Sequence, residues 1–305
     1  MNPKFRKLSP LTQRIFAPLR ALVRRLFPIG YVRWQYRYLT RHRLNLKKPV
    51  RYTEKLQYLR LFVYPKDARA IRCTDRVGVR DYLKELGLER YLVPSYGHYQ
   101  SVSEIDFSKL PRSFVMKCSH ACGFNQIICD HATIDKEQLQ ARFDRWLKTD
   151  YGKMTMERHY SPIVPRILIE EYLGQGQRLP IEYKIHVFNG KARNLYVVTG
   201  RGQDIRYTNF HIDWTPFDGS QFNGWHKADF PIQKPDNFLE MVALAEKLAA
   251  PFPFVRVDLY QIDGKIMFSE MTFTPAKGTL ILDEDQVDFQ MGTWLDISAY
   301  INQRK

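Results

Sequence analysis

The alternation of apolar and polar positions is clearest near the carboxyl end of the chain, over residues 254–274. Two alternating runs, 255–261 and 265–272, are separated by a short segment that contains Asp263-Gly264. An Asp-Gly pair between two such runs is a strong local signal for a tight β-hairpin. The pattern therefore predicts two paired antiparallel strands here.

The polar face of this hairpin carries the charged side chains. Because side chains alternate between the two faces of a strand, Arg256, Asp258 and Tyr260 share one face, as do Glu270 and Thr272 on the second strand. Two facing carboxylates are costly to bury unless a cation is held between them. Hard oxygen ligands suit Mg²⁺, so the pair Asp258 and Glu270 is a candidate metal site. The alternative is a hairpin with a solvated polar face.

The remaining pattern predicts an α+β protein with no internal repeat. Apolar or alternating runs predict strands at 91–96, 113–118, 126–129, 166–173, 182–188, 192–199 and 206–212. Helical spacing predicts helices at 54–63, 75–86, 135–148 and 234–249 and an amphipathic segment near 293–302, with Thr53 and Thr74 as N-caps and Gly87 as a helix end. Residues 148–158 and 215–233 lack periodicity and are expected to be irregular.

The predicted hairpin of strands 113–118 and 126–129 carries Lys117 beside a loop of small residues, 119–125. A lysine and backbone N–H groups in such a loop can bind phosphate oxygens. Only Gly123 is a glycine there, so the alternative of an ordinary hairpin with an exposed lysine stays open on this segment alone.

The amino-terminal segment is basic and aromatic. Apolar residues between Leu11 and Phe27 fall at helical spacing with arginines on other faces, Pro18 is expected to kink this helix, and a second aromatic and basic stretch covers 31–48. Such helices bind anionic membrane surfaces. Packing on the chain's own body or on a partner is the alternative, and nucleic acid ranks last because the body adds no further basic surplus.

Net charge and cysteines refine this picture. Residues 1–52 hold 14 Lys and Arg and no acid, whereas the rest carries 33 basic and 32 acidic residues, so the net charge of +15 belongs to the first segment. Cys73, Cys118, Cys122 and Cys129 are too few for a disulfide framework in a chain of 305 residues. We expect reduced thiols; zinc held by cysteines and nearby histidines is the alternative. The sequence shows neither a secretory signal nor an apolar run long enough for a membrane span.

Six motifs follow one another in an order that resembles the ATP-grasp superfamily, and most closely its TupA-like branch of polysaccharide biosynthesis. They are Asp75-Arg76 before Val79-Arg80, Leu110–Lys117, Ile169–Leu173, Glu182-Tyr183-Lys184 with Phe188-Asn189-Gly190, Arg256–Tyr260 and Phe268–Pro275. The likeness covers residues 50 to 292. It implies an ATP-grasp fold, in which two α+β subdomains hold ATP between antiparallel sheets.

The resemblance also implies roles for individual residues. Phosphates of ATP would be bound by Arg76, Lys117, Lys184, Ser119 and Gly123; the adenine by backbone groups of Glu171, Tyr172 and Leu173 and by the side chain of Glu170; the ribose by Glu182; Mg²⁺ by Asp258 and Glu270. Arg256 and Lys184 would act catalytically, steadying the transferred phosphoryl group. Arg76 stands where Lys is usual, Glu182 replaces Asp, Thr272 replaces the Asn of many ATP-grasp enzymes, and Ala121 replaces a frequent Gly.

This resemblance divides the chain into four parts. They are a basic amphipathic helical segment (1–50), a small helical region before the ATP site (51–105), and two ATP-grasp subdomains (106–170 and 171–305). The implied function is an ATP- and Mg-dependent carboxylate–amine ligase of cell-surface polysaccharide biosynthesis, joining an amine donor to a uronic acid or similar glycan through an acyl phosphate. Cationic candidates for holding the acceptor acid are Arg201, Arg206 and His186. We expect the acceptor pocket to be assembled from residues 150–165 and 201–235.

Two alternatives remain at this stage. A kinase would transfer phosphate to a sugar hydroxyl, and an idle membrane-tethered binding protein would keep the fold without turnover. The expected location is the cytoplasm, with residues 1–48 on the inner face of the cell membrane.

Overall fold

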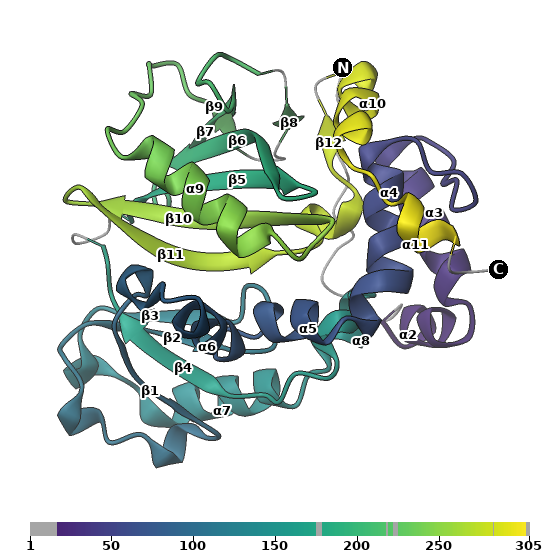
Figure 1. Cartoon of the computed structure of the whole chain (residues 1–305). Helices are drawn as coiled ribbons and strands as arrows, with labels where there is room; N and C mark the ends of the chain where they lie inside the picture. Colours follow the sequence, from purple (N-terminus) through teal and green to yellow (C-terminus); the bar gives the residue numbers. More distant parts are fainter. Residues whose placement is uncertain (1–16, 175–178, 218, 222–224, 283, 303–305) are drawn as a thin grey trace.

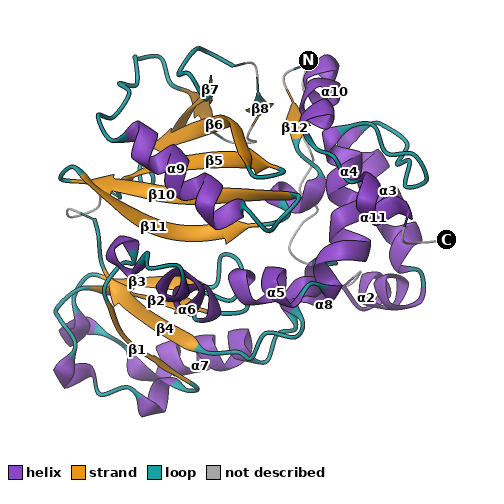
Figure 2. Cartoon of the chain, in the orientation of Figure 1, coloured by secondary structure: helices purple, strands orange, loops and turns teal. Residues whose placement is uncertain are grey.

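The computed structural model describes residues 17–174, 179–217, 219–221, 225–282 and 284–302, so residues 11–16 of the predicted first helix lie outside the described part. Most strands belong to two sheets, a larger one above a smaller one in the view of Figures 1 and 2. In the small sheet the order is β1 (Ser95–Tyr99), β4 (Ile167–Glu171), β2 (Phe114–Cys118) and β3 (Asn125–Ile128). In the large sheet it is β11 (Lys265–Thr272), β10 (Phe254–Ile262), β5 (Ile181–Phe188), β6 (Lys191–Thr199), β7 (Arg206–His211) and β9 (His226–Lys227). A separate pair joins β12 (Ile281–Leu282) to β8 (Ser220–Gln221).

Helices surround these sheets. They are α2 (Ala17–Leu26), α3 (Pro28–Thr40), α4 (Tyr52–Tyr58), α5 (Ala68–Thr74), α6 (Gly78–Glu85), α7 (Lys136–Leu147), α8 (Tyr151–Thr155), α9 (Phe238–Ala249), α10 (Asp285–Trp294) and α11 (Ser298–Asn302). A π-helical turn, Leu59–Val63, extends α4. Among the described residues, none of the helices combines the length and the hydropathy needed to cross a bilayer.

The alternation of residues on β10 decides which face of the large sheet becomes core. Val255, Val257 and Leu259 are fully buried, and α9 packs over this side of β10, β5 and β6 (Figure 1). The polar side chains of β10 therefore face the other way, toward the small sheet. The small sheet has its own core, in which Phe114 of β2 packs with Phe143 of α7. Burial of the apolar face thus turns the charged face toward the space between the sheets.

A β-bulge adjusts the second strand of the predicted hairpin. Asp258 pairs with Glu270, but Leu259 pairs with Phe268, so Ser269 is an extra residue in β11. Without it, Phe268 and Glu270 would point to the same side of the sheet. The bulge lets Phe268 stay in the core while Glu270 faces the polar side, as bulges beside functional sites commonly do.

Most predicted strands and helices are confirmed, including all three hairpins and their turns. Four predictions were wrong. Thr53 is not an N-cap, because α4 begins at Tyr52 and Thr53 instead hydrogen-bonds Asp288 of α10 through its N–H at 2.9 Å and its hydroxyl at 2.6 Å. Thr74 is the last residue of α5, a short helix that weak periodicity concealed, and α6 begins only at Gly78.

The other two concern segment boundaries. The strand expected at 91–96 lies at 95–99, because residues 89–91 form a 3₁₀ turn. Within the segment expected to be irregular, 148–158, residues 151–155 form α8, which Asp150 caps by accepting from the N–H of Lys153. The division of the chain into four parts remains a prediction; β1 (95–99) joins the small sheet although it precedes residue 106, and α4 packs against α10.

The first helix is interrupted at Phe27, between α2 and α3. The kink at Pro18 stays a prediction, because residues 11–16 before it lie outside the described part of the chain. Pro28 is the first residue of α3, where its missing N–H costs nothing, and its ring is incompatible with uninterrupted continuation of α2. Pro18 itself lies near the first described residue of α2.

Candidate functional site

A cleft of about 420 Å³ lies between the two sheets. Its lining comes from β2 and β3 of the small sheet, from β5, β6, β10 and β11 of the large sheet, and from the segment 171–174 that follows β4. The cleft therefore collects residues that are far apart in the sequence. Most residues predicted for the site line it: Arg76, Lys117, Gly123, Glu171, Tyr172, Leu173, Glu182, Lys184, Arg256 and Glu270.

Asp258 lies directly beneath the lining and is fully buried. Arg256 donates to both of its oxygens, from Nε at 2.6 Å and from Nη2 at 2.8 Å, and Lys184 of the neighbouring strand β5 forms a short ion pair with it. The guanidinium also donates to the hydroxyls of Tyr196, at 2.8 Å, and Thr272, at 2.9 Å. Because both oxygens of Asp258 accept from Arg256 and one also contacts Lys184, the carboxylate is held in one position.

Glu270 is the more accessible of the two carboxylates, with 31% of its side chain exposed. Its contacts are longer: 3.3 Å to Arg76 and 3.6 Å to Arg256. The register places it opposite Asp258, as predicted for the hairpin. Among the described residues, no three His, Cys, Asp or Glu side chains are grouped as metal ligands, so this pair would need the oxygens of a ligand to complete a metal's coordination.

Lys184 joins Asp258 to Glu182, whose carboxylate lies 2.8 Å from the ammonium. Burial acts to lower the pKa of Lys184, but Asp258 and Glu182 outweigh it and raise that pKa above its usual value. Burial likewise works against ionisation of Glu182, yet Lys184 and Arg201 keep the pKa of its carboxyl below the usual range. Arg201 donates to Glu182 at 3.0 Å. Lys184, Glu182 and Arg201 are therefore charged at neutral pH.

Lys117 faces this cluster from the small sheet. Its ammonium lies 2.6 Å from Glu170, which also accepts from Arg80 at 2.9 Å. Glu170 is thus engaged by two cations and does not line the cleft. Its contacts differ from the predicted one with an adenine amino group: in this structure Glu170 positions Lys117.

The loop 119–125 is anchored along its first half. Ser119 is fully buried and its hydroxyl donates to the carbonyl of Val164 at 3.1 Å, so the structure does not bring this predicted ligand to the cleft. Arg76 donates to the carbonyls of Cys118, at 2.8 Å, and Ala121. The tip, residues 122–123, is exposed, and Gly123 has the left-handed φ of +78° that favours glycine. Arg76 therefore orders the loop as well as adding charge.

The three residues predicted to hold the acceptor's carboxylate, Arg201, Arg206 and His186, differ in their position relative to the cleft. Arg201 lines the cleft, whereas Arg206 is not part of the lining and forms an ion pair of 2.7 Å with Asp204. His186 is buried, and burial together with Arg256 lowers its pKa to about 3. It is neutral and behind the lining, so it cannot serve as a cationic contact.

Several cleft residues escaped the sequence analysis. Tyr196 lines the cleft from β6. Tyr260 was predicted to share a face of its strand with Arg256 and Asp258, and it lines the cleft from β10, but it was not assigned a role in the site. Trp225 also lines the cleft, and Arg201 stacks on its ring at 5.3 Å. Trp225 lies in an irregular segment, where no periodicity indicates direction.

The family model for TupA-like ATP-grasp proteins matches residues 54–296, which is most of the chain. The chain belongs to the TupA-like ATP-grasp family. Its α+β fold with two sheets is the ATP-grasp fold, and such proteins are typically ATP-dependent ligases. A search of the curated proteins finds no match.

Solved ATP-grasp structures resemble this TupA-like protein only distantly. D-alanine–D-alanine ligase from Bacillus anthracis, complexed with ATP, is 15% identical over 67% of this chain and 55% of that one, with a TM-score of 0.40. The Helicobacter pylori ligase of the same name is 14% identical over 80% and 69%, with a TM-score of 0.42. The ATP-grasp ligase PsnB with its minimal precursor is 11% identical over 78% and 61%, with a TM-score of 0.39. The chain thus spans about half the length of the first of these proteins, and the family assignment rests on the family model.

The residues of the cleft fit ATP and Mg²⁺ by their chemistry. Each buried or partly buried carboxylate contacts two cations: Glu170 contacts Lys117 and Arg80, and Glu270 contacts Arg76 and Arg256. Lysines and arginines from both sheets therefore converge where a polyphosphate would need them. The oxygen-only donor set of Asp258 and Glu270 is the kind that Mg²⁺ prefers.

Proposed function

We propose that this protein is an ATP- and Mg-dependent carboxylate–amine ligase that acts in cell-surface polysaccharide biosynthesis. The observation that supports it most is the register of β10 and β11, which sets Asp258 opposite Glu270 on the cleft face, with Lys117 and Lys184 reaching in from the two sheets. Because these four charges come from four different strands, their convergence is a property of the tertiary structure.

In the proposed reaction each residue has one task. Lys117 and Lys184 bind phosphate oxygens, with the tip at Gly123 adjoining them, and backbone groups of 171–173 hold the adenine edge. Glu182 lines the same cleft, and we assign it to the ribose hydroxyls. Asp258 and Glu270 would hold Mg²⁺, which when bound neutralises charge on the phosphates.

We assign to Arg256 the task of stabilising the phosphoryl group as it is transferred. Its guanidinium is fixed by Asp258, Tyr196 and Thr272, so little reorganisation is needed when negative charge develops nearby. The proposed acceptor is a uronic acid or similar carboxylate, which after phosphorylation is attacked by an amine to give an amide. Arg201 is the cleft cation we propose as a contact for the acceptor's carboxylate, since it is the one of the three candidates that lines the cleft.

The test follows the fate of ATP in purified protein with Mg²⁺, uronic-acid glycans and amino acids. We expect ADP and inorganic phosphate only when acid and amine are both present, and loss of turnover in Glu270→Gln but not in Glu89→Gln, an exposed control outside the cleft. ADP with phosphate retained on the sugar would instead indicate a kinase. Failure to bind nucleotide at all would indicate an idle binding protein and refute the proposed site.

A further inference from the structure

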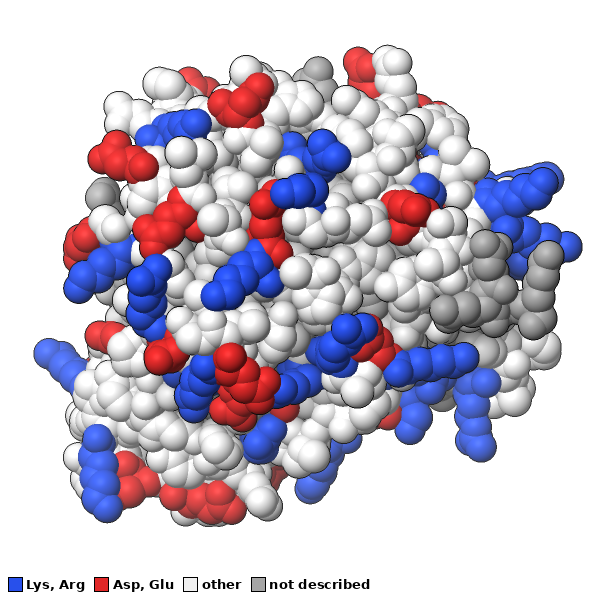
Figure 3. All heavy atoms as spheres, viewed as in Figure 1, with Lys and Arg blue, Asp and Glu red and all other residues white. Residues whose placement is uncertain are grey.

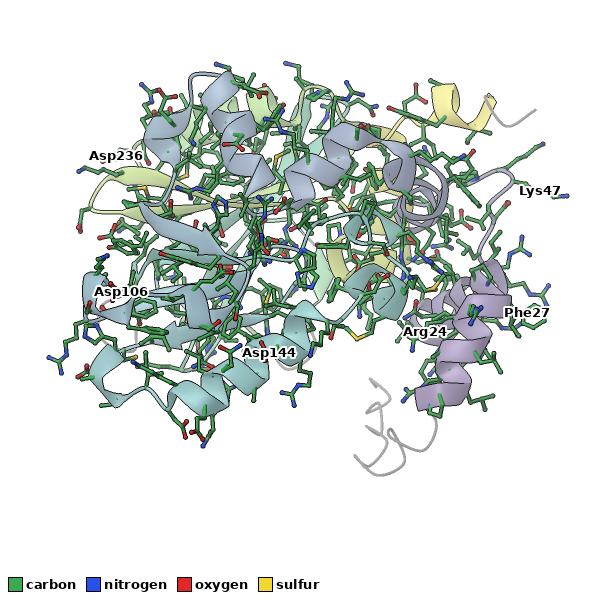
Figure 4. All side chains as sticks on the ribbon, turned by 90° about the horizontal axis from the view of Figure 1, so that it is seen from below. Arg24, Phe27, Lys47, Asp106, Asp144 and Asp236 are labelled. Carbon is green, nitrogen blue, oxygen red and sulfur yellow. The ribbon has the colours of Figure 1, made fainter. Side chains whose placement is uncertain are left out.

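The outer face of α2 is apolar although it faces solvent. Leu19, Leu22 and Leu26 are spaced three and four residues apart and so share one face, and they are 54%, 50% and 57% exposed. Phe27, at the break before α3, is 66% exposed. Figure 4 shows Phe27 at the outer edge of the molecule and Arg24 on the side nearer the body, where it donates to the carbonyl of Met154. A helix that turns leucines outward and an arginine inward is oriented for an apolar surrounding.

The exposed side of the next helix, α3, carries aromatic and basic side chains. Trp34 is 58% and Tyr38 47% exposed, and their rings stack 5.7 Å apart. Arg33 and Arg37 of α3 are exposed as well, as is Arg41, which follows the helix and lies 5.7 Å from the Tyr38 ring. Lys and Arg side chains project from this edge of the molecule in Figure 3.

The inner face of α3 is fixed to the body. Val32 and Tyr36 are fully buried, and the hydroxyl of Tyr36 hydrogen-bonds that of Thr53 at 2.7 Å. Thr53 is bonded in turn to Asp288. The outer face is therefore presented by a rigid support and is not a loose tail.

The charge of this segment indicates what it contacts. Residues 1–52 contain 14 Lys and Arg and no acid, while the rest of the chain is nearly neutral. The family match begins only at residue 54, so this surface lies outside the part that the chain shares with its family. A partner for it must combine negative charge with an apolar layer.

We infer that the outer face of α2 and α3 docks on an anionic phospholipid surface. Leu19, Leu22, Leu26 and Phe27 enter the boundary between headgroups and acyl chains, Trp34 and Tyr38 lie at headgroup level, and the arginines bind lipid phosphates. Nucleic acid would use the arginines but leave the leucines exposed, and a second copy related by a twofold axis would bring arginines against arginines. This inference does not depend on the reaction that the cleft performs.

The experiment sediments the full-length protein with vesicles of phosphatidylcholine alone or with 30 mol % phosphatidylglycerol. We expect at least tenfold stronger binding to the anionic vesicles, weakened by high salt. Each basic residue near an anionic surface contributes about a fivefold factor, so Arg33→Glu/Arg37→Glu should weaken binding by roughly 25-fold or more. Leu22→Ser/Phe27→Ser should also weaken it. Brominated lipids should quench fluorescence of the wild type, and a Trp34→Phe variant should lose that quenching.

The controls match these variants in kind. Arg145→Glu/Lys148→Glu changes two exposed cations at the end of α7, and Leu239→Ser changes a leucine of α9 that is 76% exposed; neither should affect vesicle binding. Retained nucleotide binding in every variant would show that each is folded. Equal binding to neutral and anionic vesicles would overturn the inference, as would wild-type binding by Arg33→Glu/Arg37→Glu. The inference would also be overturned if the wild type does not bind vesicles but forms a dimer, or a complex with duplex DNA, that the same variants abolish.

Discussion

Replacing either carboxylate of the β10–β11 pair should abolish magnesium-dependent nucleotide binding, but only one replacement should also destabilise the fold. Asp258 is fully buried and accepts from Arg256 and Lys184, so Asp258→Asn leaves two buried cations short of a counter-charge. Removing one partner of such a buried pair costs about 3–5 kcal/mol. Glu270 has 31% of its side chain exposed and ion pairs of 3.3 and 3.6 Å, so Glu270→Gln should cost about 1 kcal/mol or less.

The assay is urea unfolding of wild type and both variants, with and without Mg·ATP. We expect ligand to raise the unfolding free energy of the wild type only, since a ligand stabilises the state that binds it. The double variant Asp258→Asn/Lys184→Met should recover part of the loss, because it removes one of the uncompensated cations. An Asp258→Asn protein as stable as wild type, or a Glu270→Gln protein as unstable as Asp258→Asn, would refute this account of the site.

Three further predictions follow from the same structure. Lys117→Met should raise the Kd for an ATP analogue by about 10- to 100-fold, which is the contribution of a charge-assisted hydrogen bond. The fold should lose little stability, because Arg80 still pairs with Glu170. Calorimetry measures the Kd, with replacement of the 81% exposed Lys109 by Met as the control, and equal binding by the two variants would contradict the prediction. Arg76→Lys keeps the positive charge but cannot reproduce both hydrogen bonds to the carbonyls of Cys118 and Ala121. We therefore expect weaker ATP binding and faster proteolysis within residues 119–125. An unchanged rate of cleavage there would contradict the anchoring role of Arg76. His186 (buried near Arg256 and Lys184) and His159 (buried near Arg60) have pKa values lowered to about 3, first by burial and then by these cations. In the unfolded chain each histidine takes up a proton near pH 6.5, whereas in the folded protein it stays neutral down to about pH 3. The free energy of unfolding is therefore highest above pH 6.5 and falls as the pH drops toward 3, by about 2 kcal/mol per histidine at pH 5. His186→Asn should flatten the pH dependence of unfolding and the exposed His98→Asn should not; equal slopes would refute it.

Local sequence determined the elements that carry the site. Alternation around an Asp-Gly turn is enough to predict the β10–β11 hairpin and the polar face of β10 that carries Asp258, because both properties depend on residues adjacent in the chain. Unbroken alternation would set Ser269 opposite Asp258, so the pairing of Asp258 with Glu270 also needs the bulge. The order of motifs was likewise sufficient for the family, and the charge count for the basic segment.

The tertiary structure decided which polar groups meet. Ser119 and Glu170 were themselves predicted as ATP ligands, yet Ser119 bonds Val164 and Glu170 is shared by Lys117 and Arg80, since those partners lie on other elements. The bulge at Ser269 is also a tertiary outcome, because only the core's demand for Phe268 explains the extra residue. For the same reason the outward direction of the α2 leucines could not be predicted: periodicity defines a face of a helix, and only packing shows whether that face is covered.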